Sequence, residues 1–358
     1  MTRAAAFEIE YTQYLSETSE VIQALPQFAR NPATLIEMYR WMVLTRAFDK
    51  KAVALQRTGK LGTYPTSLGQ EAVSVALGSV MKADDVLFPY YREYGGQFIR
   101  GVTMTEILLY WGGDERGMNY QHQRRDFPIC IPIATHGPQA AGTAYAFKLR
   151  KEKRAAVYVC GEGATSKGDF YEAVNAAGVW KLPLLILVNN NQYAISVPRS
   201  SQTGAVTIAQ KAIAGGFLGE QVDGNDVIAL RDRIGKALDK AYNGGGPTLI
   251  EALTYRLGDH TTADDASRYR TDEEVNYHWR LEPISRLRRY MTAQGIWSDA
   301  QEEALAAQCT EKIEAAVQDY LAIPPQPPET MFDHMFAEPT HDLLKQREQF
   351  LARKARHG

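Results

Sequence analysis

Two apolar segments that end in oxygen-bearing side chains constrain the fold of this chain most strongly. Residues 155–160 run into a Gly-Glu-Gly turn at 161–163, and residues 184–188 run into three consecutive asparagines. A segment of helical character lies between them, so the unit predicts two parallel strands joined by a crossover helix. Ligands of open α/β sheets bind at the carboxyl ends of the strands. We therefore expect Glu162 and Asn191 to lie at one edge of a parallel sheet.

The oxygen donors at these strand ends are of the kind that bind Mg²⁺ beside a diphosphate. Glu162 would supply a carboxylate, Asn191 an amide oxygen and Tyr193 a backbone carbonyl. A Gly-acid-Gly sequence alone is more often an ordinary turn. The asparagines favour a site, because they form strands and helices poorly and need hydrogen-bond partners at a buried strand end.

Alternating helical and apolar patterns along the rest of the chain predict the α/β class, with a parallel central sheet flanked by helices. The expected helices cover residues 33–57, 70–81, 103–111, 138–150, 227–242 and 298–321. The expected strands cover residues 86–91, 155–160, 184–188 and 249–255.

Both ends of the chain differ from this pattern. Residues 1–32 are expected to form an irregular N-terminal arm, and residues 33–322 the diphosphate-binding α/β domain. A Pro-rich linker opens residues 323–358, a C-terminal helical tail that we expect to contact a partner subunit. Its apolar side chains are too numerous to be left in water. They are Met331, Phe332, Met335 and Phe336.

Composition excludes several classes of function. The net charge of −2 gives no general attraction to nucleic acid or to an anionic membrane. No run of about 20 apolar residues predicts a transmembrane helix. The acidic N-terminus argues against a targeting peptide, and the three cysteines lack CxxC spacing. These features predict a cytoplasmic protein with free thiols.

The Gly-acid-Gly turn followed by Asn-Asn resembles the thiamine-diphosphate fingerprint. From about Ala33 to the tail, the chain resembles the alpha subunit of the decarboxylating component of 2-oxoacid dehydrogenase complexes. The segments that carry this resemblance are RTGKLGTYPTSLGQEA, VLFPYYREYG, GEGATSKGDFYEAVNAAG, NNNQYAIS, VDGNDV, GGGPTLIEALTYRLGDHTTADDASRYR and EVNYHW. The resemblance implies a thiamine-diphosphate-binding fold, with thiamine diphosphate and Mg²⁺ as cofactors.

The resemblance also implies roles for individual residues. Glu162, Asn191 and the Tyr193 carbonyl match the magnesium ligands, and Tyr91 with Arg92 matches the pair that holds the diphosphate. Residues 133–139 match a loop whose backbone holds the aminopyrimidine ring. The implied cofactor-binding residues are Tyr91, Arg92, Ile133, Gly161, Glu162, Gly163, Ala164, Asn191, Tyr193 and His260.

His260 is the implied catalytic residue, on a loop that closes over the mouth of the site in this family. A histidine that is neutral or cationic near pH 7 can steer an anion or donate a proton. Taken alone, a histidine in a polar loop is most often a solvated residue. The loop would be braced by neighbouring polar side chains. They are Asp264, Asp265, Tyr269 and Arg270, with Arg256 on the preceding strand.

Two positions depart from the family pattern. The usual metal-binding Asp is Glu162 here, which keeps the carboxylate and is also found in branched-chain members. Some relatives place an Arg two residues before the metal-binding Asn, where this chain has Asn189. The loss of that charge is expected to shift the binding of phosphate toward Arg92 and His260.

The resemblance implies that a beta subunit completes the cofactor site in an α2β2 assembly. The beta subunit would contribute the Glu that activates the cofactor. The other partners would be a lipoyl-bearing acyltransferase core and a small 2-oxoacid substrate. The segments RTGKLGTYPTSLGQEA, TSKGDFYEAVNAAG and SSQTGAVTIAQKAIAGG resemble pyruvate-type alpha subunits most, whereas YHWRLEPISRLRRY and the Glu162 turn resemble branched-chain ones. The order of preference is pyruvate, then a branched-chain 2-oxoacid such as 3-methyl-2-oxobutanoate, then acetoin. The alternative from another class is a non-catalytic structural paralogue. An NAD-binding oxidoreductase is disfavoured, because no GxGxxG follows an early strand.

Overall fold

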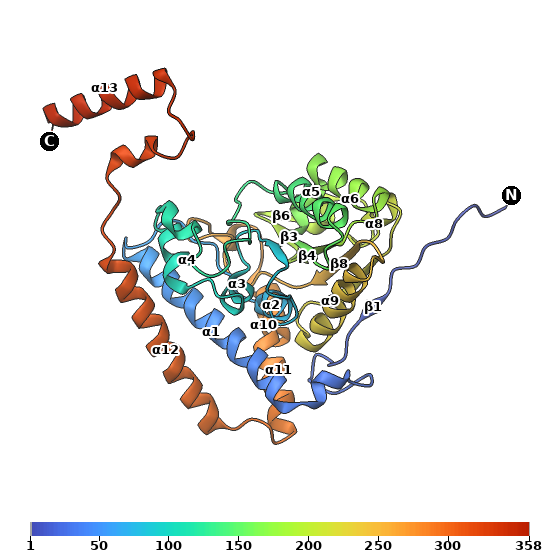
Figure 1. Ribbon diagram of the computed structural model, residues 1–358. Coiled ribbons are helices and arrows are strands. Elements are labelled where there is room, and N and C mark those ends of the chain that lie inside the picture. The colour runs from blue at the N-terminus through green and yellow to red at the C-terminus, as the bar shows by residue number, and fades with distance from the viewer. Residues whose placement is uncertain (1, 358) are drawn as a thin grey trace.

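A six-stranded parallel sheet forms the centre of the structure, a computed structural model that describes residues 2–357 (Figure 1). The strand order is β1-β7-β8-β4-β3-β2, and every neighbouring pair runs parallel. The strands are β1 Tyr11–Thr12, β2 Val86–Phe88, β3 Ala156–Gly161, β4 Leu184–Asn190, β7 Gly219–Asp223 and β8 Thr248–Leu253. The expected α/β class with a parallel central sheet is confirmed.

The central strands are apolar throughout because both faces of the sheet are covered. Successive side chains of β3 point to opposite faces, so Val157 and Val159 join one core while Tyr158 and Cys160 join the other. Helices α5 His136–Leu149 and α6 Gly168–Val179 cover the second face. Figure 1 shows them on one side of the sheet, with α1, α2 and α9 on the other.

The first core is built mainly by helices from the two ends of the chain. They are α1 Pro32–Arg57, α2 Glu71–Gly78, α3 Tyr94–Ile99, α4 Met104–Trp111, α9 Val227–Tyr242, α11 Pro283–Ala293 and α12 Asp299–Ala322. Helix α10, Asp272–Leu281, precedes α11. The expected capping box of Ser298 with Gln301 opens α12, and Thr103 with Glu106 opens α4 in the same way. No helix within residues 2–357 is both long enough and apolar enough to span a bilayer.

Several predicted boundaries move by a few residues. Helix α9 begins and ends where predicted, whereas the helix expected over 70–81 ends at Gly78. The strand expected over 86–91 ends at Phe88, because Pro89 has no N–H to continue the ladder. Strand β4 runs two residues beyond the predicted end, since Asn189 and Asn190 pair with β8.

The N-terminal arm is not irregular throughout, which corrects the prediction for residues 1–32. Its β1 pairs with β7 and forms one edge of the sheet. The buried carboxylate of Asp226 fixes the following residues, because its Oδ2 accepts 2.7 Å hydrogen bonds from the backbone N–H groups of Tyr14 and Leu15. The same side chain caps the N-terminus of α9.

The C-terminal tail leaves the body of the molecule after α12 (Figure 1). It contains the 3-10 helix η5 Pro328–Phe332 and helix α13 His341–His357. Met331 is 57% exposed and Met335 is 60% exposed, so these side chains are not buried against this chain. Their docking on a partner subunit therefore stays a prediction.

Candidate active site

The sheet brings Glu162 and Asn191 together. Strands β3 and β4 are neighbours, and Gly161 is paired with Asn189, so the residues that follow both strands emerge side by side. The backbone N–H of Asn191 donates a 3.2 Å hydrogen bond to Glu162 Oε2. Glu162 is only 2% exposed, and burial raises the pKa of its carboxyl group. The two side chains predicted to bind the metal therefore lie together at the carboxyl ends of β3 and β4.

The two glycines beside Glu162 are present for different reasons. A side chain at Gly163 would place its Cβ 2.7 Å from the Cβ of Ala194, so this close approach requires glycine. Gly161 has an ordinary φ of −78°, and a Cβ there would meet nothing nearer than 4.0 Å. Since neither its conformation nor its protein neighbours require glycine, Gly161 leaves room for a ligand over the end of β3.

Only the last of the three asparagines faces the site. The side-chain amides of Asn189 and Asn190 are bonded to other buried side chains, namely Tyr90, Thr254 and Glu251. Asn191 donates 2.9 Å from Nδ2 to Gln70 Oε1, which leaves its Oδ1 turned toward the backbone of Tyr193. The side chain of Asn189 is therefore engaged in the core and does not line the cavity.

Arg92 and His260 form the basic side of the site. Arg92 is 2% exposed, and its Nη2 donates to the His260 carbonyl at 2.8 Å and lies 3.1 Å from His260 Nδ1. Burial first, and then the positive charges of Arg92 and Arg256, lower the pKa of His260 to about 3. His260 is therefore neutral at pH 7 when no ligand is bound. The sequence left open whether this side chain is neutral or cationic, and the structure favours the neutral form. The ring of Tyr91 meets His260 edge to face, with ring centroids 6.1 Å apart.

Three buried arginines around this loop have no acidic partner. Arg92, Arg256 and Arg270 are nearly fully buried, and within residues 2–357 no carboxylate oxygen lies within 4.0 Å of their guanidinium nitrogens. Their partners are chiefly backbone carbonyls, among them that of Tyr193, which accepts from Arg256 Nη1 at 3.0 Å. Burying unpaired cations is unfavourable unless an anion compensates them. Of the three, Arg92 faces the cavity described below, where an anion such as a diphosphate would compensate its charge.

The loop of residues 257–270, called the His260 loop below, is braced by the side chains that the sequence suggested. Asp264 Oδ2 accepts 2.8 Å from the His260 N–H and also accepts the hydroxyl of Tyr269. Arg270 donates to three consecutive backbone carbonyls at the start of the loop. Asp265 is the exception, since its side chain only caps the short 3-10 helix that follows it.

A single cavity of about 510 Å³ joins the acidic and the basic side. It is lined by all ten residues that the resemblance implied for the cofactor: Tyr91, Arg92, Ile133, Gly161, Glu162, Gly163, Ala164, Asn191, Tyr193 and His260. Sequence reasoning missed other lining residues, including Trp111, Cys130, Ile131 and Tyr158. Nothing in their local patterns separates them from core residues.

Three non-glycine residues beside the cavity adopt left-handed backbone conformations. They are Ala134 with a φ of 65°, Gln192 with 74° and Ile195 with 55°. Such a conformation is unfavourable for a β-branched residue and persists only where its surroundings impose it. At Ile195 the surroundings include Arg256 Nη2, which donates 2.8 Å to the Ile195 carbonyl.

The donor set fits a magnesium ion that is shared with a phosphate. No cluster of three or more His, Cys, Asp or Glu side chains that could hold a metal occurs within the described residues. One carboxylate, one amide oxygen and one carbonyl would leave coordination positions for phosphate oxygens. Gln202, which the sequence did not reveal, donates 3.2 Å from Nε2 to Glu162 Oε1 and orients that carboxylate.

Comparison with known proteins agrees with this geometry. Residues 39–329 match the family described as "Dehydrogenase E1 component". The chain belongs to the dehydrogenase E1 component family. That match covers the whole sheet except β1, and both sides of the cavity.

Two kinds of relative occur among similar E1 components. The chain is 42% identical to the 3-methyl-2-oxobutanoate dehydrogenase subunit alpha of Mycobacterium tuberculosis, over 90% of this chain and 88% of the relative. It is 36% identical to the pyruvate dehydrogenase E1 component subunit alpha of Bacillus subtilis, over 96% and 93%. The corresponding subunit of Acholeplasma laidlawii is 38% identical, over 88% and 92%.

Proposed function

We propose that this chain is the alpha subunit of a 2-oxoacid dehydrogenase that uses thiamine diphosphate and Mg²⁺. The observation that carries the proposal is the single cavity between Glu162 with Asn191 and the unpaired Arg92. Oxygen donors on one side and buried cations on the other match the charge pattern of a magnesium diphosphate. Membership of the E1 family supports the same assignment.

The residues around the cavity would divide the work of holding the cofactor. Glu162, Asn191 and the Tyr193 carbonyl would hold the metal, and Arg92 would bind diphosphate oxygens through its planar fork. When bound, thiamine diphosphate supplies the nucleophilic carbon and the electron sink that decarboxylation of a 2-oxo acid requires. Neutral His260 keeps its proton on Nε2, because its Nδ1 accepts from Arg92.

A partner chain would complete the site. Among the residues that line the cavity, Glu162 is the single carboxylate, and its place is beside the metal. Activation of the aminopyrimidine ring needs a second carboxylate, which supports a beta subunit in an α2β2 assembly as its source. The acyl group would then pass to a lipoyl-bearing acyltransferase.

The substrate we put first is pyruvate, as the sequence segments favour. A branched-chain 2-oxo acid is the second candidate, because the M. tuberculosis relative at 42% identity is a 3-methyl-2-oxobutanoate dehydrogenase subunit. The half-exposed side chains of Ile131 and Ile133 form an apolar wall of the cavity that could accept a branched chain. One or two methylenes change substrate preference by only about 1–3 kcal/mol, so a direct comparison is needed.

Calorimetry on the chain co-purified with its beta subunit tests the proposal. Thiamine diphosphate is expected to bind only when Mg²⁺ is present, and the assembly is expected to decarboxylate a 2-oxo acid. The ratio of kcat/KM for pyruvate and 3-methyl-2-oxobutanoate then decides between the two substrates. Metal-dependent binding without turnover of either acid would instead support a non-catalytic paralogue. Absence of metal-dependent binding would reject the assignment.

A further inference from the structure

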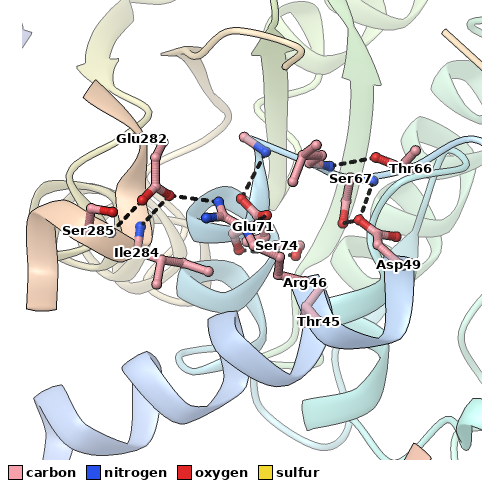
Figure 2. A network of polar contacts seen from close by, with 12 residues as sticks. Thr45, Arg46, Asp49, Thr66, Ser67, Glu71, Ser74, Glu282, Ile284 and Ser285 are labelled. Carbon is pink, nitrogen blue, oxygen red and sulfur yellow. Dashed lines mark hydrogen bonds and ion pairs between the residues drawn. The ribbon is translucent and has the colours of Figure 1, made fainter. Parts of the chain in front are cut away.

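Asp49 is a buried carboxylate in the middle of helix α1, where an aspartate is unfavourable. It is 2% exposed, and within residues 2–357 no cationic nitrogen lies within 4.0 Å of it. Aspartate is a poor helix former, and a buried charge is costly without partners. Asp49 Oδ1 accepts 2.5 Å from the Tyr64 hydroxyl. Its Oδ2 accepts 2.8 Å from both the N–H and the Oγ of Ser67 (Figure 2).

All these donors belong to residues 64–69, called the 64–69 segment below. The opposite side of the segment is paired with the His260 loop. Tyr64 N–H donates 3.0 Å to Thr262 Oγ1, and Thr262 N–H donates 3.0 Å to the Tyr64 carbonyl. Further along, Leu257 N–H donates 3.2 Å to the Leu68 carbonyl. The segment therefore joins α1 to the start of the His260 loop at Leu257 and to Thr262, two residues after His260.

The segment also touches the basic side of the cavity directly. The Thr66 carbonyl accepts from Arg92 Nη1, the guanidinium that lies beside His260. Gly69 has a φ of +87°, and a Cβ there would lie 2.5 Å from the Tyr255 carbonyl, so the two backbones can approach this closely only with glycine.

An ion-pair cluster holds the far end of the segment (Figure 2). Gly69 N–H donates 3.0 Å to Glu71 Oε2, and Arg46 bridges Glu71 to Glu282 with two contacts of 2.7 Å. The segment is thus fixed at both ends from α1, since Asp49 and Arg46 lie one turn apart on that helix. Neither residue lines the cavity.

We propose that Asp49 is a positioning residue for the His260 loop and acts through the 64–69 segment. Asp49 fixes Tyr64 and Ser67. The backbone of Tyr64 then fixes Thr262, and the carbonyl of Thr66, which lies between them, fixes Arg92. The importance of this positioning for catalysis rests on the proposed function. The effect of Asp49 on the order of the loop does not depend on the proposed function, because every contact that links Asp49 to His260 lies within the polypeptide.

Limited trypsin digestion of the full-length chain without cofactor tests this inference. Arg268 is exposed on the His260 loop whereas Arg270 is buried, so cleavage after Arg268 reports loop opening. Cleavage of a transiently opened segment follows the population of the open form. Asp49→Asn is expected to raise the rate of this cleavage about tenfold, because the added amide N–H₂ opposes the donors of Tyr64 and Ser67.

A matched control separates loop order from general destabilisation. Asp226 is likewise buried and without a cationic partner, but it holds the N-terminal arm and α9. Asp226→Asn is expected to lower the unfolding temperature while it changes Arg268 cleavage less than about twofold. An equal rise in cleavage in both variants would overturn the inference.

Thr262→Val tests the other end of the connection and keeps the inference falsifiable if Asp49→Asn fails to fold. It removes the acceptor of Tyr64 N–H and is expected to raise Arg268 cleavage by about tenfold as well. The double variant should cleave no faster than about the quicker single variant, because both changes open the same connection. Unchanged cleavage in Thr262→Val, or multiplied effects in the double variant, would contradict the proposed route.

Discussion

The acidic and basic sides of the cavity are held in place by different means. Glu162 and Asn191 follow directly after β3 and β4, so the hydrogen-bonded ladder of the sheet sets their spacing. Arg92 and His260 lie 168 positions apart in the chain and meet only because a loop folds back over the site. The acidic side is thus fixed by local connection to strands, whereas the basic side depends on many long-range contacts.

The largest effect is expected on the acidic side. Glu162→Ala removes the single carboxylate of the donor set and should weaken Mg²⁺-dependent binding of thiamine diphosphate by at least about 1,000-fold, since loss of orienting partners alone costs about 10- to 100-fold. Calorimetry measures the change. Glu162→Asp keeps a shorter carboxylate and should retain part of the affinity. Full affinity in Glu162→Ala would disprove the metal assignment.

A smaller loss is expected on the basic side, because Arg256 and Arg270 remain nearby. Arg92→Met should weaken binding of thiamine diphosphate by about 30- to 100-fold, as one charge-assisted pair is lost. Arg92→Lys keeps the charge without the fork and should fall between Arg92→Met and the unmodified chain. Thiamine, which has no diphosphate, is the control ligand. If Arg92→Met weakened thiamine as strongly as thiamine diphosphate, the residue would not act on the phosphates.

The pH dependence of folding stability is a further property that distinguishes the basic side of the cavity from the acidic side. The pKa of His260 lies at about 3 in the folded chain, whereas an ordinary histidine, as in the unfolded chain, has a pKa of 6.5. Between these values the unfolded chain binds a proton that the folded chain does not. His260 therefore contributes stability above pH 6.5 and loses that contribution as the pH falls toward 3. The unfolding temperature should fall less steeply over this range in His260→Gln, and identical slopes in both proteins would contradict the depressed pKa.

The smallest of these effects concerns the residue that orients Glu162. Gln202→Ala removes a 3.2 Å hydrogen bond to Glu162 Oε1 and should weaken metal-dependent binding by less than about tenfold. Gln202→Glu places a second carboxylate beside Glu162 and should weaken binding more than the alanine variant does. Titration with Mg²⁺ at saturating thiamine diphosphate measures both. An effect of Gln202→Ala as large as that of Glu162→Ala would show that orientation and ligation cannot be separated here.

Sequence periodicity predicts the elements that have strong local signals. Helix α9 combines an amphipathic pattern with an Asp226 cap, and the prediction matches its true ends. Helix α3 escapes prediction because it is short and contains Gly95 and Gly96, which are poor helix formers. Strand β1 has only two residues, and its pairing with β7 cannot be inferred from local pattern.

The residues of the site also differ in whether a local sequence pattern identifies them. The spacing of Glu162 and Asn191 identifies the acidic side from the residues themselves, because each follows an apolar strand. Arg92 and His260 are assigned only through family resemblance, since a lone Tyr-Arg pair or loop histidine carries little information. Gln202 reaches Glu162 from 40 positions away, a contact that no local pattern encodes.

The three unpaired buried arginines have a consequence for the lifetime of the protein in a cell. Arg92 lines the cavity, and an anionic ligand that compensates the charge there binds the folded chain alone and shifts folding toward that state. Chain that is synthesised while thiamine is scarce should therefore populate unfolded forms more often and meet proteases sooner. Pulse-chase labelling in thiamine-starved and thiamine-replete cells would measure this as a difference in half-life, and equal half-lives would show that the buried charge is already compensated in the unliganded protein.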